Sequence, residues 1–268
     1  MAIKDLLPNV QQCGTFDTAF HQTLPKKAYL YAIPYKYYEN LKVRRYGFHG
    51  TSHKFVSKKA AEFLNLDFNN CKIITCHLGN GASIAAVKNG KSIDTSMGLT
   101  PVEGLIMGTR AGDFDLGALL YIAEKEQLSL KQISDLVNKQ SGVLGISGIS
   151  SDMRDIENAA WKDKDEKALL ALDMYHYRIK KYIGSYAAAM EGVDVIVFTG
   201  GIGENGPESR EEICKGMEFM GVEISKEKNN GLRSKLAQIS SDKSRVKVLV
   251  VPTNEELVIA QDTVALIS

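Results

Sequence analysis

The stretch Val193–Gly221 constrains the fold more than any other part of the chain. The run VIVF at 195–198 is β-branched and aromatic, which is typical of a buried strand. Pro207 and the acids after it favour a helix that we expect to run through Met217, and Gly221 suits its end. Between strand and helix lie the glycines Gly200, Gly201, Gly203 and Gly206. A strand, a glycine turn and a helix N-terminus present unpaired N–H groups to an anion, so this stretch predicts a nucleotide site.

The kind of nucleotide is a separate question. Gly201, Gly203 and Gly206 also satisfy the G-x-G-x-x-G spacing of a dinucleotide-binding turn, and Glu223 follows about 20 residues later. The same glycines are equally able to close a tight strand-to-helix turn that binds no ligand. All three interpretations stay open when this stretch is considered alone.

Composition narrows the class of protein. The chain has 268 residues and 44% hydrophobic residues, enough for one large or two ordinary domains with a substantial core. Its net charge of +1 gives no broad attraction for nucleic acid or anionic lipid. The chain contains neither a signal-peptide pattern nor an apolar run of about 18 residues, so we expect a cytoplasmic protein without membrane contact.

The cysteines point to the same compartment. No pair among them has the C-x-x-C spacing of a zinc or redox site, so we expect buried free thiols in a reducing cytosol. The four are Cys13, Cys71, Cys76 and Cys214.

Apolar periodicity and turn residues predict an alternation of strands and helices. Asn89-Gly90 is a strong hairpin signal, and Thr51 or Ser52 is suited to cap the helix that follows. The tyrosine stripe of the longest helix favours a core or subunit contact, and the long irregular segment 97–115 is typical of a functional loop. Strands are expected at 72–76, 84–87, 91–95, 195–198 and 246–251, and helices at 3–7, 51–64, 116–126, 129–139, 165–191 and 253–267.

Six motifs then identify a family. They are FDTAFH at 16–21, YGFHGTSH at 46–53, HLGNGAS at 77–83, MGTRAGD at 107–113, FTGGIGEN at 198–205 and TNEE at 253–256. In this order they resemble the acetokinase family of the actin-like ATPase superfamily, from about residue 2 to the C-terminus. The resemblance implies an α/β fold in which two RNase H-like domains face each other across a cleft for ATP, Mg²⁺ and a carboxylate. It also implies a phosphotransferase that moves the γ-phosphate of ATP reversibly to acetate, giving ADP and acetyl phosphate, and a homodimer formed through the second domain.

The resemblance assigns a catalytic group and a metal ligand. Arg110 and His49 match the family's transition-state stabilisers, and Glu255 matches its magnesium-linked glutamate. Asp17 matches a catalytic aspartate that is often described as a base. Because the acceptor carboxylate is already ionised at neutral pH, we expect Asp17 to orient the metal or the arginine instead.

The resemblance also assigns the ATP-binding residues. The phosphate loop is His77, Leu78, Gly79, Asn80 and Gly81; the nucleotide-lining segment is Asp152, Met153 and Arg154; the adenosine loop is Gly201, Ile202, Gly203, Glu204 and Asn205. Pro101 matches a wall of the small acyl pocket. Structural roles are expected for the remaining candidates. His21, His53 and His176 are expected to pack in the core or lie at the surface, Asp113 to order its loop, and Glu256 to be a solvated helix cap.

One part of the family pattern has no match. The family's first strand and its serine-rich turn have no counterpart, so by resemblance roughly the N-terminal third is absent. We therefore expect residues 1–20 to be a remnant of the first domain, 21–254 a complete nucleotide-binding second domain, and 255–268 a terminal helix of the first. A catalytically inactive nucleotide-binding and dimerising remnant is the alternative function, followed by a propionate kinase or an NAD-binding domain.

Overall fold

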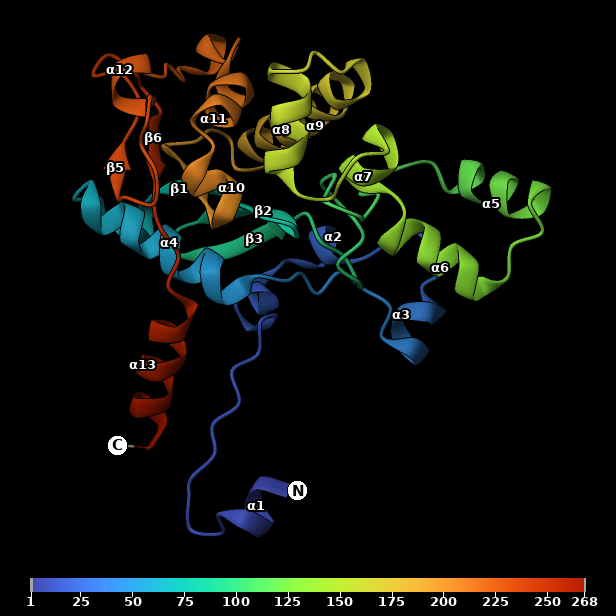
Figure 1. Ribbon diagram of the computed structural model, residues 1–268. Helices are drawn as coiled ribbons and strands as arrows, with labels where there is room; N and C mark the ends of the chain where they lie inside the picture. Colours follow the sequence, from blue (N-terminus) through green and yellow to red (C-terminus); the bar gives the residue numbers. More distant parts are fainter. Residues whose placement is uncertain (1, 268) are drawn as a thin grey trace.

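A computed structural model describes residues 2–267 and centres on a six-stranded mixed sheet with the order β3-β2-β1-β4-β6-β5 (Figure 1). Strands β1, β2 and β3 form an antiparallel meander, β4 and β6 continue it in parallel with β1, and β5 is antiparallel to β6. The strands are β1 Lys72–Leu78, β2 Ala82–Lys88, β3 Lys91–Thr95, β4 Val195–Thr199, β5 Ala237–Gln238 and β6 Lys247–Val250. The mixed sheet confirms the expected α/β class.

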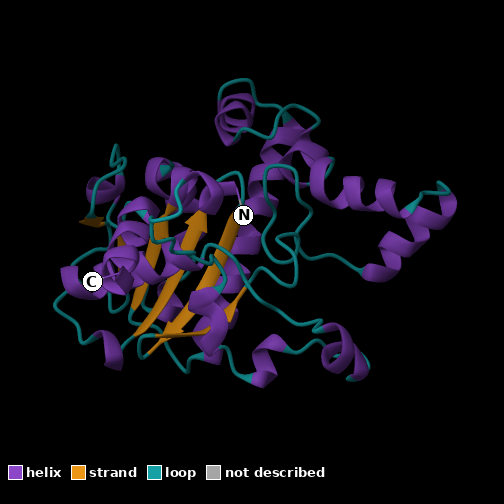
Figure 2. Ribbon diagram, turned by 90° about the horizontal axis from the view of Figure 1, so that it is seen from below, coloured by secondary structure: helices purple, strands orange, loops and turns teal. Residues whose placement is uncertain are grey.

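Helices surround this sheet (Figure 2). They are α1 Ala2–Leu6, α2 Lys26–Tyr29, α3 Lys36–Leu41, α4 Gly50–Phe63, α5 Leu116–Lys125, α6 Leu130–Lys139, α7 Gly142–Ser147, α8 Met153–Trp161, α9 Glu166–Ala189, α10 Gly200–Asn205, α11 Pro207–Cys214, α12 Lys226–Asn229 and α13 Glu255–Ile267. Short 3-10 turns lie at Ala19–Thr23, Phe68–Asn70 and Glu218–Met220. Within the described residues 2–267, no helix is both long and apolar enough to cross a membrane.

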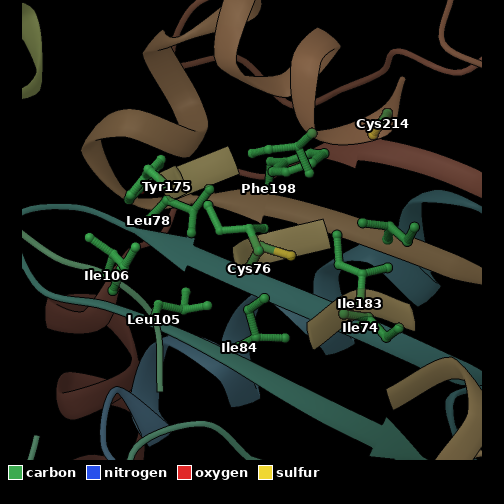
Figure 3. Packing of buried hydrophobic residues seen from close by; sticks show 14 of the residues in the cluster. Ile74, Cys76, Leu78, Ile84, Leu105, Ile106, Tyr175, Ile183, Phe198 and Cys214 are labelled. Carbon is green, nitrogen blue, oxygen red and sulfur yellow. The ribbon is translucent and has the colours of Figure 1, made fainter. Parts of the chain in front are cut away.

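Both faces of the sheet are apolar because helices cover both. In β4, Val195 and Val197 pack on the side of α4, while Ile196 and Phe198 pack on the side of α9. Phe198 thereby joins the larger core beside Cys76, as Figure 3 shows. This double burial explains why VIVF is a continuous apolar run and not an alternating one.

The β1–β2 hairpin fixes the end of the sheet that matters for the site. Its register pairs Leu78 with Ala82, which leaves 79–81 as a tight loop. The β2–β3 turn has positive φ at both central positions, 54° at Asn89 and 75° at Gly90, as expected for an Asn-Gly hairpin.

The glycine cluster differs from the expected loop. Helix α10 begins at Gly200, directly after β4, so Gly201 and Gly203 lie in a helix. Pro207 starts α11 as expected, but α11 ends at Cys214 and does not continue through Met217. Gly216, two residues after the end of α11, has a positive φ of 75°, which no α-helix continues through.

The start of α4 also differs from expectation. His49, and neither Thr51 nor Ser52, occupies the N-cap position, with a left-handed φ of 55°. Asp17 Oδ2 accepts a hydrogen bond from the His49 backbone N–H at 2.6 Å, which holds this unusual conformation. A contact across 32 positions of sequence therefore decides where α4 begins.

Arg210 explains how the short helix α10 is held. Its guanidinium is fully buried and donates to the carbonyls of Gly203 at 2.9 Å, Glu204 at 3.0 Å and Leu232 at 2.8 Å, and to Asn229 Oδ1 at 2.9 Å. The first two carbonyls lie near the C-terminus of α10, where a helix leaves acceptors unpaired. Burial lowers the pKa of Arg210 to about 10.

Two terminal segments lie apart from the sheet (Figure 1). Helix α13 contacts α4 and buries Val258, yet Val264 and Leu266 on it are exposed. In and after α1, Leu6 and Phe16 are exposed as well. The division into a second domain and two first-domain segments remains a prediction.

Candidate active site

A cavity of about 590 Å³ opens where β1 and β4 end. Several of the expected nucleotide-binding residues line it: Gly79, Asn80, Asp152, Met153, Arg154, Gly201, Ile202 and Asn205. Gly108, Val143, Ser151, Glu157, Tyr175, Gly206 and Arg233 complete the lining. The structure thus brings together three segments that lie far apart in the sequence.

Other residues of the expected nucleotide segments point elsewhere. The Leu78 side chain is fully buried in the larger core, and Gly203 packs against the backbone of Phe198. His77 stacks beneath His49, with ring centroids 4.2 Å apart and planes inclined by 19°. These residues shape the loop and the helix without lining the cavity.

Glu204 closes part of the expected anion site. Its Oε1 accepts from the backbone N–H of Gly200 at 3.0 Å and of Thr253 at 3.2 Å. The expectation that this turn leaves its N–H groups unpaired is therefore wrong at Gly200, because a carboxylate of the same helix reaches back to it. Glu204 joins α10 to the segment that leads into α13.

Asp152 organises the beginning of α8. Its Oδ1 accepts from the Arg154 backbone N–H at 2.9 Å, and its carboxylate also pairs with the Arg154 guanidinium at 2.5 Å. These hydrogen bonds lower the pKa of Asp152 to about 2. The pair keeps an exposed guanidinium at the rim of the cavity.

His49 and Arg110 flank Gly81 on the sheet side of the site. A Cβ atom added to Gly81 would lie 3.3 Å from Arg110 Nη1 and 3.6 Å from His49 Nε2. Burial lowers the pKa of His49, and the nearby Arg110 charge lowers it further, against the opposing effect of Asp17. The arrangement therefore offers a cation and a neutral imidazole to the same small space.

Asp17 and Glu255 bring two carboxylates to this space. Asp17 Oδ2 is occupied by the His49 N–H, whereas Oδ1 is buried and has no hydrogen-bond partner among the residues described. The pKa of Glu255 is raised by burial and, to a smaller extent, by the negative charge of Asp17. An unpartnered buried oxygen beside a second carboxylate suits a hard cation. In residues 2–267 no group of three or more His, Cys, Asp or Glu side chains is arranged to hold a metal ion.

The sequence analysis did not predict that buried histidines cluster behind His49. His53 is fully buried, with Nδ1 2.7 Å from Thr75 Oγ1 and Nε2 2.8 Å from Ser83 Oγ. His21 is buried too, and its Nε2 lies 3.0 Å from the carbonyl oxygen of Phe48. Packing is therefore the correct choice for these two histidines. The spacing of His49 and His53, one turn apart on α4, is the signal that links them.

The sequence analysis also did not predict Tyr175 and Glu157 as cavity residues. Tyr175 is 1% exposed, lines the cavity, and its hydroxyl has no hydrogen-bond partner among the described residues. Glu157 accepts from Ser209 Oγ at 3.2 Å. Both lie on helices whose apolar pattern indicates core, so the sequence carries no signal for a cavity wall.

The segment 97–115 is pinned at several points. Glu103 pairs with Arg45 at 2.5 Å and accepts from the Tyr31 hydroxyl at 2.5 Å. Asp113 accepts from the Gly104 N–H at 2.7 Å, which confirms its loop-ordering role. Pro101, half-buried in this segment, is not among the residues lining the cavity, and its place in an acyl pocket stays a prediction.

The free thiols agree with expectation for the most part. Cys71, Cys76 and Cys214 are buried, and all four cysteines are unpaired. Cys13 is only partly buried, because it lies in the extended segment after α1.

The buried histidines generate a prediction about pH. Burial lowers the pKa of His21 from 6.5 to about 4, so the unfolded chain binds a proton at pH values where the folded chain does not. The stability due to neutral His21 is complete above pH 6.5 and is lost as the pH falls from 6.5 towards 4. When the pH is lowered from about 7.5 to about 5.5, the free energy of unfolding of the wild type should decrease. The decrease in His21→Gln should be smaller by about 1.4 kcal/mol.

Urea unfolding at the two pH values measures this difference. His176→Gln is an independent replicate, since burial also lowers the pKa of His176 to about 4. Parallel pH dependence in wild type and both variants would show that these rings are not held neutral.

Comparisons with known proteins agree with this architecture. The sequence model of the acetokinase family matches residues 1–261. The chain is 61% identical to acetate kinase from Phocaeicola vulgatus over 267 residues, covering 100% of this chain and 67% of that protein. It is 62% identical to acetate kinase from Thermoanaerobacterium thermosaccharolyticum over 262 residues, covering 98% and 65%.

Solved structures show the same likeness. The crystal structure of Porphyromonas gingivalis acetate kinase matches with a TM-score of 0.97 and 57% identity, covering 100% of this chain and 67% of that one. A propionate kinase from Francisella tularensis matches with a TM-score of 0.90 and 44% identity, covering 97% and 66%. The chain spans about two thirds of the length of these relatives. From its sequence and its fold alike, the chain belongs to the acetokinase family.

Proposed function

We propose that this chain carries the phosphoryl-transfer site of an acetate kinase, which moves the γ-phosphate of ATP reversibly to acetate. One observation carries the proposal. His49 and Arg110 flank Gly81 at the end of β1, beside the carboxylates of Asp17 and Glu255 and next to the cavity. Such a site places positive charge and a hydrogen-bond donor where a transferring phosphoryl group needs them.

The chemistry requires little proton transfer. An acetate acceptor is already ionised at neutral pH, so positioning and charge neutralisation dominate the barrier. In this proposal Arg110 and His49 Nε2 meet the charge on the equatorial oxygens of the moving phosphoryl group. Asp17 positions His49 through the 2.6 Å hydrogen bond to its backbone and does not act as a base.

Asp17 and Glu255 also suit a divalent cation. The free Oδ1 of Asp17 and the Glu255 carboxylate would hold Mg²⁺, which is the cation we propose. When bound, the ion would neutralise phosphate charge at the transfer site.

The nucleotide would occupy the cavity. Its volume of about 590 Å³ is within the usual range for small-molecule sites. We place the phosphates along Gly79 and Asn80, which line the cavity, and on towards Gly81; the adenosine lies against Ile202 and the wall formed by Tyr175. An NAD-binding domain is disfavoured, because Gly201 and Gly203 lie within α10 and Glu223 bonds Ser241.

A propionate kinase is the second candidate, favoured by the similarity to the Francisella tularensis structure named as one. Pro101 is our proposed wall of the acyl pocket, and its size would set the preference between the two acids. All four cysteines are unpaired thiols, which supports a cytoplasmic enzyme.

We also propose a homodimer. Helices α5 and α6 stand clear of the sheet in both views (Figures 1 and 2), and they expose Leu116, Leu120, Tyr121 and Leu130 by 62–86%. Large apolar side chains exposed to this extent are typical of an interface. Light scattering should give twice the monomer mass, and Leu120→Asp with Tyr121→Asp should return the monomer; a wild-type monomer at tens of micromolar would contradict the proposal.

Trapping the acyl phosphate as a hydroxamate tests the function. With ATP, Mg²⁺ and acetate, we expect product from the wild type and a loss of about 100-fold or more in Arg110→Ala and His49→Ala, because each removes transition-state stabilisation. The matched control is Arg245→Ala, an exposed arginine outside the site. Absence of product from the wild type would contradict an active enzyme and leave the non-catalytic nucleotide-binding remnant.

Nucleotide binding is tested separately by thermal unfolding. Added ADP at about 100 times its dissociation constant should stabilise the wild type by about 2.7 kcal/mol. A side chain at Gly201 meets no atom within 4 Å and would project into the cavity, so Gly201→Val should fold normally yet lose this stabilisation.

Gly184→Val is the matched control, because Gly184 in α9 also has open space around a new Cβ but does not line the cavity. Retained ADP stabilisation in Gly201→Val would place the nucleotide elsewhere. Stabilisation by NAD in place of ADP would revive the dinucleotide interpretation.

A further inference from the structure

A line of four side chains runs from the centre of the sheet to His49. Thr75 Oγ1 lies 2.7 Å from His53 Nδ1, and His53 Nε2 lies 2.8 Å from Ser83 Oγ. Ser83 Oγ in turn lies 2.9 Å from His49 Nδ1. The other nitrogen of His49, Nε2, faces the space beside Gly81 and Arg110. Each neutral imidazole has one donor and one acceptor nitrogen, so the direction of one bond decides the next.

Thr75 sets the direction of this line. Its side chain is fully buried, and among the described residues the sole hydrogen bond of Oγ1 is with His53. A hydroxyl that only accepts would leave its own proton unpaired in the core, at a cost of about 1–3 kcal/mol. Thr75 therefore donates, and His53 Nδ1 accepts.

We propose that Thr75, His53 and Ser83 are positioning residues that fix His49 as the Nε2–H tautomer. With Nδ1 accepting, His53 donates from Nε2 to Ser83 Oγ, and the Ser83 hydroxyl donates to His49 Nδ1. The proton of His49 then sits on Nε2, where it points into the site. The tautomer follows from the hydrogen bonds alone, and its use as a donor to a phosphoryl oxygen rests on the proposed function.

The opposite direction has two costs. It would leave the buried Thr75 proton without an acceptor, and it would place the lone pair of His49 Nε2 in the site. A lone pair there would repel the oxygens of a phosphoryl group. The depression of the His53 pKa well below 6.5 by complete burial supports a neutral relay, since a doubly protonated ring has no acceptor nitrogen.

Two of the three remaining histidines, His77 and His21, provide internal references. Thr253 Oγ1 donates to Ser52 Oγ at 2.9 Å, so Ser52 donates to His77 Nδ1 at 2.8 Å. His21 Nε2 faces the carbonyl of Phe48, which only accepts. Both rings therefore carry Nε2–H by routes that do not involve Ser83.

Long-range ¹H–¹⁵N NMR of the full chain, labelled at its five histidines, tests the relay. We expect His49 and His53 in wild type to show a protonated Nε2 and an unprotonated Nδ1. In Ser83→Ala the Nε2–H to Nδ1–H ratio of His49 should fall about tenfold or more, because nothing then donates to Nδ1. His77 should keep its tautomer in that variant.

Two further variants separate the relay from a general packing effect. Thr75→Val keeps the shape but lacks the hydroxyl, and should shift His53 and His49 together; Thr75→Ser keeps the hydroxyl and should retain the wild-type ratios. Ser52→Ala should change His77 and leave His49 unchanged.

An Nδ1–H tautomer of His49 in wild type overturns the proposal, whether or not any variant folds. Unchanged His49 ratios in folded Ser83→Ala and Thr75→Val overturn it as well. Adding a non-hydrolysable ATP analogue and Mg²⁺ to the same sample separates the relay from the proposed function: an intact tautomer with no response at His49 Nε2 contradicts the proposed function and not the relay.

Discussion

The parallel pairing of β1 with β4 is the constraint on which the rest of the structure depends. In this register Ile73 lies beside Val195 and His77 beside Thr199, so both strands end at the same edge of the sheet. The β1–β2 loop and α10 follow at once, and the cavity opens between them. A shift of the register by one residue would exchange the faces of the sheet to which the side chains of β4 point, and it would separate the loop from the helix.

Buried polar groups hold this edge in place. Arg210 binds the last carbonyls of α10, Glu204 binds its first N–H, and Ser83 lies between His49 and His53. Each group is satisfied by named partners, because an unpaired buried group would cost about 1–3 kcal/mol. Among the described residues three buried side-chain atoms are exceptions: Asp17 Oδ1 and the Tyr175 hydroxyl, which belong to the candidate site, and Arg45 Nε, which lies outside it.

Local pattern predicted much of the fold but not the details of the site. All the strands except the two-residue β5, together with the Asn89-Gly90 turn and the long helix α9, follow from apolar periodicity and turn chemistry, which act between near neighbours. The start of α4, the helical course of the glycines and the capping by Glu204 depend on contacts between distant segments, so no local signal shows them. The apolar pattern of its helix indicates core for Tyr175, and the side chain does pack in the core on one side while it forms the cavity wall on the other. Three of the six motifs, at 77–83, 107–113 and 198–205, contribute residues that line the cavity, while the side-chain directions within each segment came from packing.

The central claim is that the cavity holds a nucleotide whose terminal phosphate reaches His49 and Arg110. The most direct measurement is a crystal structure of this chain with a non-hydrolysable ATP analogue and Mg²⁺. The account predicts the adenosine against Ile202, the phosphates along Gly79–Gly81, and the terminal phosphate within hydrogen-bond distance of His49 Nε2 and Arg110. Phosphates directed instead towards Arg154 and Arg233 at the rim, or a nucleotide outside the cavity, would contradict it.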